Sequence, residues 1–203
     1  RISSSEVEST AITARILDQE QNSLDLKLKT TGKHYVKNAT ALLTLIASLK
    51  LSSSKAITAL QKWAPSAGRG QVSEIKFKKG ERSIAIHLID ESYNANPGSI
   101  RCSLETLACI FTNKKNTCHP NMRIAVLGDM LELGSSEVKE HMNILKFARL
   151  SQIDKIYCVG SRMRKLYDVL PISKRGFWTE TAEDMQHVLV NKLKNGDIVM
   201  IKG

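Results

Sequence analysis

The sequence predicts an α/β protein built on a mainly parallel sheet with helices on both faces. From residue 72 onwards, apolar strands alternate with stretches that repeat apolar residues at helical spacing, which is typical of parallel sheets. Glycine, proline and polar residues separate these segments. With 203 residues and 42% hydrophobic content, the chain can bury the core of one large domain or two small ones.

The first third of the chain predicts short strands followed by two helices. Strands are expected within residues 10–29, where alternation is clearest in Leu24–Leu28. Apolar residues at helical spacing predict a mostly buried helix over residues 38–51. A second helix follows Ser52–Ser54 and ends before Pro65.

A linker-like run over residues 64–70 contains one proline and two glycines, so we expect a domain boundary between residues 1–70 and 71–203. A loop is expected around His119 and Pro120. The other elements expected in the second part are strands at 72–77, 83–89, 123–127, 155–159, 176–179 and 198–202, and helices at 97–111, 136–150, 163–169 and 182–193.

Composition favours a soluble globular protein. The net charge of +10 would suit nucleic acid, but lysines occur in ones and twos and aromatic residues are 5%, so we expect no nucleic-acid partner. No apolar run approaches the roughly 20 residues of a membrane helix, and no signal segment opens the chain. The four cysteines lack C-x-x-C spacing. We therefore expect reduced thiols, a cytoplasmic location and no membrane insertion.

A polar stretch follows the strand predicted at residues 83–89. Asn96 suits a helix N-cap and Pro97 the first helical position. Asp90 and Glu91 could hold a ribose hydroxyl or a metal-bound water, and Asn94 and Asn96 could bind a base, a sugar or a peptide. Ligands of open α/β sheets bind at such strand ends. The alternative is a turn held by local side-chain bonds.

Three other strings are candidate sites. The loop Gly128–Ser135 follows a predicted strand and precedes His141, but it lacks the Lys-Ser/Thr ending of a P-loop. Arg69, between two glycines, could bind phosphate, and His34 and Asn38 could point together at a ligand. The alternatives are a solvated Arg69, a solvated or packed His141 and Asn38 as a helix cap. No residues show metal-ligand spacing or a convincing Ser/His/Asp set.

In this order and at these intervals, the strings resemble those of the Mur ligase family from about residue 10 onwards. The strings are Gly32-x-His34-x-x-x-Asn38, Ala67–Gly70, Asp90–Pro97 and Gly128–Gly134 with His141. The resemblance implies an enzyme of three domains. This chain is similar to the end of the central, P-loop-type ATPase domain and to nearly all of the Rossmann-like C-terminal domain. We therefore expect a piece of a longer protein that lacks the P-loop and is inactive alone.

The resemblance also implies roles for individual residues. Asn38 is expected to contact adenine, and Arg69 the terminal phosphates of ATP as a catalytic residue. The nucleotide side is completed by Asp90, Glu91, Tyr93, Asn94 and Asn96, and the substrate side by Asp129, Glu132, His141 and Lys202. Many relatives have Asp at the position of Glu91, so the charge is kept but the reach differs.

The reaction implied is ATP-dependent joining of D-alanyl-D-alanine to UDP-N-acetylmuramoyl-tripeptide through an acyl phosphate, in peptidoglycan precursor synthesis. ATP and magnesium are expected in the full-length enzyme and neither on this chain alone. A monomer is expected. The third tripeptide residue, lysine or diaminopimelate, stays open. The alternative function is a non-catalytic, basic, Rossmann-like nucleotide-binding module.

Overall fold

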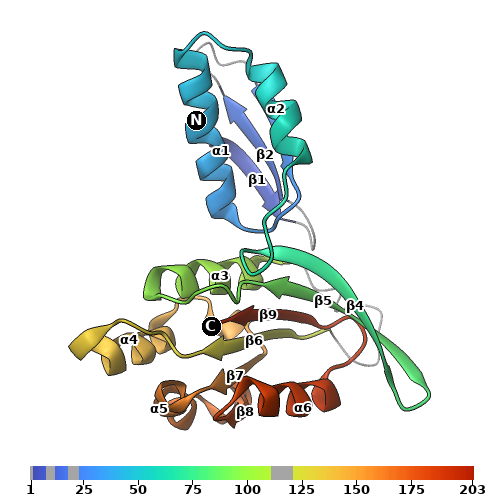
Figure 1. The fold of residues 1–203 in the computed structure, drawn as a ribbon, viewed down its shortest axis with the longest axis vertical. Coiled ribbons are helices and arrows are strands. Elements are labelled where there is room, and N and C mark those ends of the chain that lie inside the picture. Colours follow the sequence, from blue (N-terminus) through green and yellow to red (C-terminus); the bar gives the residue numbers. More distant parts are fainter. Residues whose placement is uncertain (1, 8–11, 18–22, 111–120) are drawn as a thin grey trace.

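The computed structural model describes residues 2–7, 12–17, 23–110 and 121–203, which form two sheets and their helices (Figure 1). The loop predicted around His119 and Pro120 lies outside these residues. The first sheet is antiparallel, with strands in the order β1 (Ile2–Val7), β2 (Ile12–Leu17) and β3 (Ser23–Leu28). The alternation predicted for residues 24–28 is confirmed, because Leu26 and Leu28 are buried between exposed neighbours.

Two helices follow the first sheet, α1 (Lys33–Ser48) and α2 (Ser53–Lys62). The expected start of the first helix at residue 38 is wrong, because Gly32 is the N-cap residue and Asn38 lies inside the helix. The alternative of Asn38 as a helix cap is therefore wrong too. The earlier start follows from Val36, which is buried and extends the apolar face formed with Ala39 and Leu43.

The second sheet confirms the prediction of a mainly parallel sheet. Its six strands lie in the order β4-β5-β9-β6-β7-β8, and every neighbouring pair is parallel except the β4–β5 hairpin at one edge. The strands are β4 (Gln71–Lys79), β5 (Arg82–Asp90), β6 (Arg123–Gly128), β7 (Lys155–Val159), β8 (Arg175–Thr179) and β9 (Ile198–Lys202).

Helices cover both faces of this sheet. They are α3 (Pro97–Cys109), α4 (Glu137–Asn143), α5 (Ser161–Val169) and α6 (Ala182–Lys192). Buried residues of α3 and α5 pack in one apolar cluster with strand residues such as Leu127 and Met200. Met185 and Leu189 of α6 pack in a second cluster with the alternate strand residues, including Val126 and Val199. The alternation of strand side chains thus supplies two separate cores.

The helix predicted over residues 136–150 is wrong in its second half. Helix α4 ends at Asn143, a 3-10 turn covers Ile144–Lys146, and Phe147 has an extended backbone. The sequence contains no helix breaker there, but Phe147 packs against the apolar core. Tertiary packing therefore overrides the local helix propensity.

The carboxyl ends of β5, β9 and β6 lie side by side, because these parallel strands are neighbours. Asp90 ends β5, Lys202 ends β9 and Gly128 ends β6. A Cβ atom on Gly128 would lie 3.0 Å from Cα of Gly203, so glycine permits this close approach. None of the described helices has the length and apolar character that a membrane crossing requires.

Candidate functional site

The polar turn after β5 is held by its own side chains. Oδ1 of Asp90 accepts hydrogen bonds from the backbone N–H of Ser92 at 3.1 Å and from its hydroxyl at 2.6 Å. Oδ1 of Asn94 accepts the N–H of Ala95 at 2.8 Å. The local bonds of the turn interpretation are therefore present, and they hold the side chains of Asp90 and Asn94 in place.

Asn96 is the N-cap of α3, as predicted. Its side chain accepts the N–H of Ser99 at 2.8 Å, and the Ser99 hydroxyl accepts the N–H of Asn96 at 3.0 Å. Pro97 occupies the first helical position. This capping box fixes the end of the turn to the start of a packed helix.

The linker before β4 is hydrogen-bonded to the same turn. The N–H of Gly68 donates to Oδ2 of Asp90 at 2.9 Å, and the N–H of Gly70 donates to the Asp90 carbonyl at 2.7 Å. In return, the carbonyl of Gly68 accepts the N–H of Tyr93 at 3.0 Å. Partial burial would raise the pKa of Asp90, but the hydrogen bonds from Ser92 and Gly68 lower it below its usual value.

Arg69 has a fixed backbone and an exposed side chain. The hydroxyl of Tyr35, on the first turn of α1, donates to the Arg69 carbonyl. The guanidinium lies over the ring of Tyr93, 3.9 Å from its centroid. A cation that stacks on an exposed ring at a fixed backbone position can turn toward an anion at small energetic cost.

Lys202 lies beneath the turn as a buried cation. Its Nζ donates to the carbonyl of Glu91 at 3.2 Å and to the carbonyl of Asn94. It lies 3.6 Å from Oε2 of Glu91. Burial lowers the pKa of the neighbouring His34, with Lys202 acting in the same direction and Glu91 opposing it. The carboxylate of Glu91 thus lies close to Lys202 and His34.

The loop after β6 is a second cluster. The carboxylate of Asp129 accepts the N–H groups of Arg162 at 3.2 Å and Met163 at 2.7 Å, at the N-terminus of α5. His141 is fully buried, with Nδ1 donating to the carbonyl of Glu137 at 2.7 Å and Nε2 accepting the N–H of Met130 at 3.0 Å. Of the two alternatives for His141, solvated or packed, the packed one is therefore correct.

Residues 77–203 match the family model described as "Mur ligase, glutamate ligase domain". The chain belongs to the Mur ligase family. The prediction made from the ordered strings is therefore confirmed.

The relatives of this Mur ligase chain include two bacterial proteins named UDP-N-acetylmuramoyl-tripeptide–D-alanyl-D-alanine ligase. The one from Mycobacterium leprae is 30% identical over 78% of this chain and 31% of the relative. The one from Rickettsia prowazekii is 25% identical over 89% of this chain and 36% of the relative. The chain thus spans about a third of the length of these relatives.

A solved structure shows the same fold. The MurF ligase of Thermotoga maritima, in complex with ADP, aligns with a TM-score of 0.75 at 21% identity, covering 100% of this chain and 42% of that one. This likeness confirms the α/β fold with its mainly parallel sheet.

The Mur ligase fold brings together one part of the predicted site. Arg69, Asp90, Tyr93, Glu91, Asn94 and Lys202 form one connected group at the ends of β5 and β9. Asn38 is exposed on α1, one turn beyond His34. Asp129 and His141 belong to the β6 loop with Glu132, which is exposed and has φ of 61°.

Sequence reasoning missed Tyr35, which holds the backbone of Arg69 and stacks near Trp63, with ring centroids 5.1 Å apart. The signal available was an aromatic residue inside the Gly32–Asn38 string. Among the described residues, no three His, Cys, Asp or Glu side chains are arranged to hold a metal ion.

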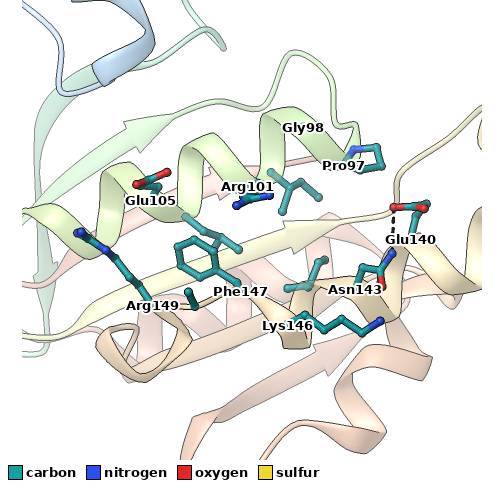
Figure 2. A pocket seen from close by; sticks show the side chains of 13 residues that line it. Pro97, Gly98, Arg101, Glu105, Glu140, Asn143, Lys146, Phe147 and Arg149 are labelled. Carbon is teal, nitrogen blue, oxygen red and sulfur yellow. Dashed lines mark hydrogen bonds between the residues drawn. The ribbon is translucent and has the colours of Figure 1, made fainter. Parts of the chain in front are cut away.

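A separate hollow of about 500 Å³ lies between α3 and residues 140–149 (Figure 2). Ile100, Leu104 and Ile144 are among its apolar lining residues, and Arg101 and Lys146 also line it. None of the predicted site residues lines it. We therefore treat it as distinct from the candidate site.

Proposed function

We propose that this chain is the C-terminal part of an ATP-dependent ligase that joins D-alanyl-D-alanine to UDP-N-acetylmuramoyl-tripeptide. The observation that carries the proposal is the turn at the end of β5, to which the linker of Arg69 is hydrogen-bonded. Relatives of this name match over most of the chain and support the choice of substrate. We propose that residues 1–70 end the ATPase domain and residues 71–203 form the C-terminal domain.

The nucleotide would lie between these two parts. The turn and the linker supply one wall, because Asp90 orders both of them and Arg69 is exposed beside them. We propose that Asp90 accepts a ribose hydroxyl and that Arg69 leaves Tyr93 to bind phosphate oxygens bidentately. Tyr93, Asn94 and Asn96 complete this wall, and Asn38 contacts the adenine.

The chemistry requires charge neutralisation and then exclusion of water. The γ-phosphoryl group passes to the tripeptide carboxylate and ADP leaves; the dipeptide amine then attacks the acyl phosphate and phosphate leaves. Arg69 would stabilise the negative charge that develops on the transferring group. Closure of the two parts about the linker would keep water from the mixed anhydride. We propose that Asp129, Glu132 and the loop held by His141 border the dipeptide.

Magnesium would serve the full-length enzyme, but we assign none of its ligands to this chain. The described residues contain no cluster of three side chains that fits a metal ion. These 203 residues contain no G-x-x-x-x-G-K-[ST] string, and we propose that the phosphate-binding loop belongs to another part of the full-length protein. We propose a monomer that works in the cytoplasm, where ATP is available.

Phosphate release with ATP, the tripeptide substrate and D-alanyl-D-alanine tests this function. The full-length protein should release phosphate, and the 203-residue chain alone should not. Turnover by the isolated chain would contradict the division of roles.

The alternative is a non-catalytic, basic, Rossmann-like nucleotide-binding module, which the absence of a P-loop string upstream of this chain would favour. It predicts nucleotide binding by the full-length protein with no phosphate release. A G-T-N/S-G-K-T/S string upstream of this chain would favour the ligase instead.

A further inference from the structure

Lys202 is a buried cation whose hydrogen-bond partners all belong to one turn. Its side chain is 5% exposed, and its two backbone acceptors, Glu91 and Asn94, stand on either side of Ser92 and Tyr93. A buried ammonium costs several kcal/mol of desolvation unless it is paired and hydrogen-bonded. These contacts offset that cost only while the turn keeps its present shape.

Glu91 supplies the opposite charge from inside the turn. Its side chain is 12% exposed, and Oε2 lies 3.6 Å from Nζ of Lys202. Its backbone N–H donates to the carbonyl of Ile201 at 2.9 Å, so Glu91 is attached to β9 by main chain as well. The buried Glu91 carboxylate thus offsets the charge of Lys202.

We propose that Lys202 and Glu91 are positioning residues, which hold the turn of residues 90–96 in the shape that receives the nucleotide. This inference rests on the proposed function and assigns neither residue a contact with the dipeptide. We therefore assign Lys202, which was expected on the substrate side, to the nucleotide side, where it connects β9 to the turn of residues 90–96. Tyr93, whose ring stacks under the guanidinium of Arg69, lies in the sequence between Glu91 and Asn94, whose carbonyls accept hydrogen bonds from Lys202.

Hydrogen exchange of the 203-residue chain tests, without any assay of activity, whether Lys202 holds the turn in shape. In Lys202→Met, the amides of residues 91–95 should exchange about ten-fold faster or more. The matched control is Lys79→Met, because Nζ of Lys79 also donates to two backbone carbonyls, those of Asn191 and Leu193, at 2.6 and 3.2 Å. The control should leave residues 91–95 unchanged. Unchanged exchange of the turn in Lys202→Met would overturn the proposal.

Should Lys202→Met fail to fold, Glu91→Gln carries the same test, because glutamine keeps the backbone bonds and removes only the charge. Faster exchange of the turn in Glu91→Gln supports the proposal, and exchange equal to the parent overturns it.

Steady-state kinetics of the full-length ligase separate positioning from substrate contact. Lys202→Met should raise the KM for ATP by about ten-fold and leave the KM for D-alanyl-D-alanine unchanged. Adding Glu91→Gln to that variant should recover part of the loss, because it removes an unpaired buried carboxylate. A rise confined to the KM for the dipeptide, or strictly additive effects, would overturn the proposal. If the full-length protein shows no ligase activity, the proposed function is wrong. Hydrogen exchange still tests whether Lys202 and Glu91 hold the turn in place.

Discussion

Replacing His141 with leucine should destabilise the chain by about 3 kcal/mol. The ring is fully buried and contacts two backbone groups, the N–H of Met130 and the carbonyl of Glu137. Leucine fills a similar volume without a polar atom, so the N–H of Met130 loses its partner at a cost of about 1–3 kcal/mol. The lost bond to Glu137 adds about 1 kcal/mol. His141→Gln should recover about half of the loss, because its amide oxygen can accept the Met130 N–H.

Urea unfolding measures this difference through the midpoint and the slope of the transition. The matched control is His187→Leu, since His187 is exposed on α6 and should change stability by about 0.5 kcal/mol or less. A loss below about 1 kcal/mol in His141→Leu would refute the reasoning, because the cost of an unpaired buried N–H would then be absent.

The turn, the linker and the sheet core each allow a shorter test. Because the pKa of Asp90 is lowered on folding, its carboxylate stabilises the chain near pH 7, and this stabilisation is lost as the pH falls through the folded-state pKa. Urea midpoints should therefore show Asp90→Asn less stable at pH 7 and approaching the parent in acid; a constant difference would contradict this. Gly68 has φ of +73°, and a Cβ there would lie 3.0 Å from the nitrogen of Tyr93, so Gly68→Ala should lose about 1–3 kcal/mol in urea unfolding. An unchanged midpoint would contradict the strain. Burial raises the pKa of Cys158 to about 12, so maleimide at pH 8 should label exposed Cys102 in the folded chain but Cys158 only after unfolding. Equal labelling rates would contradict this.

The order and type of most elements could be predicted from the sequence because those signals are local. The strand that ends at Asp90 and the helix that begins at Pro97 were expected within a residue of their observed positions. The neighbours of each strand could not be predicted, because alternation does not report pairing. Strand β9, the last in sequence, lies between β5 and β6. The early end of α4 depends on packing of Phe147, which no local pattern encodes.

In the candidate site, too, the local contacts could be predicted from the sequence and the long-range contacts could not. Asn96 was recognised as a cap because its partner lies three residues away. The burial of Lys202 was not foreseen, since its contact with Glu91 joins residues that are 111 positions apart. Tyr35 was missed for the same reason, because its partner Arg69 lies 34 positions away. Residue types and order thus located the candidate residues, while their contacts arise only in the folded chain.

The most direct test of the proposed function is phosphate release by the full-length protein with its amine substrate varied. The account predicts phosphate release that requires ATP, UDP-N-acetylmuramoyl-tripeptide and D-alanyl-D-alanine together, and a product whose mass has gained the dipeptide. In Arg69→Ala, the rate should fall about 100-fold or more, as expected for the loss of a charge that stabilises phosphoryl transfer. Equal phosphate release with a single amino acid in place of the dipeptide, or none with all three substrates, would contradict the account.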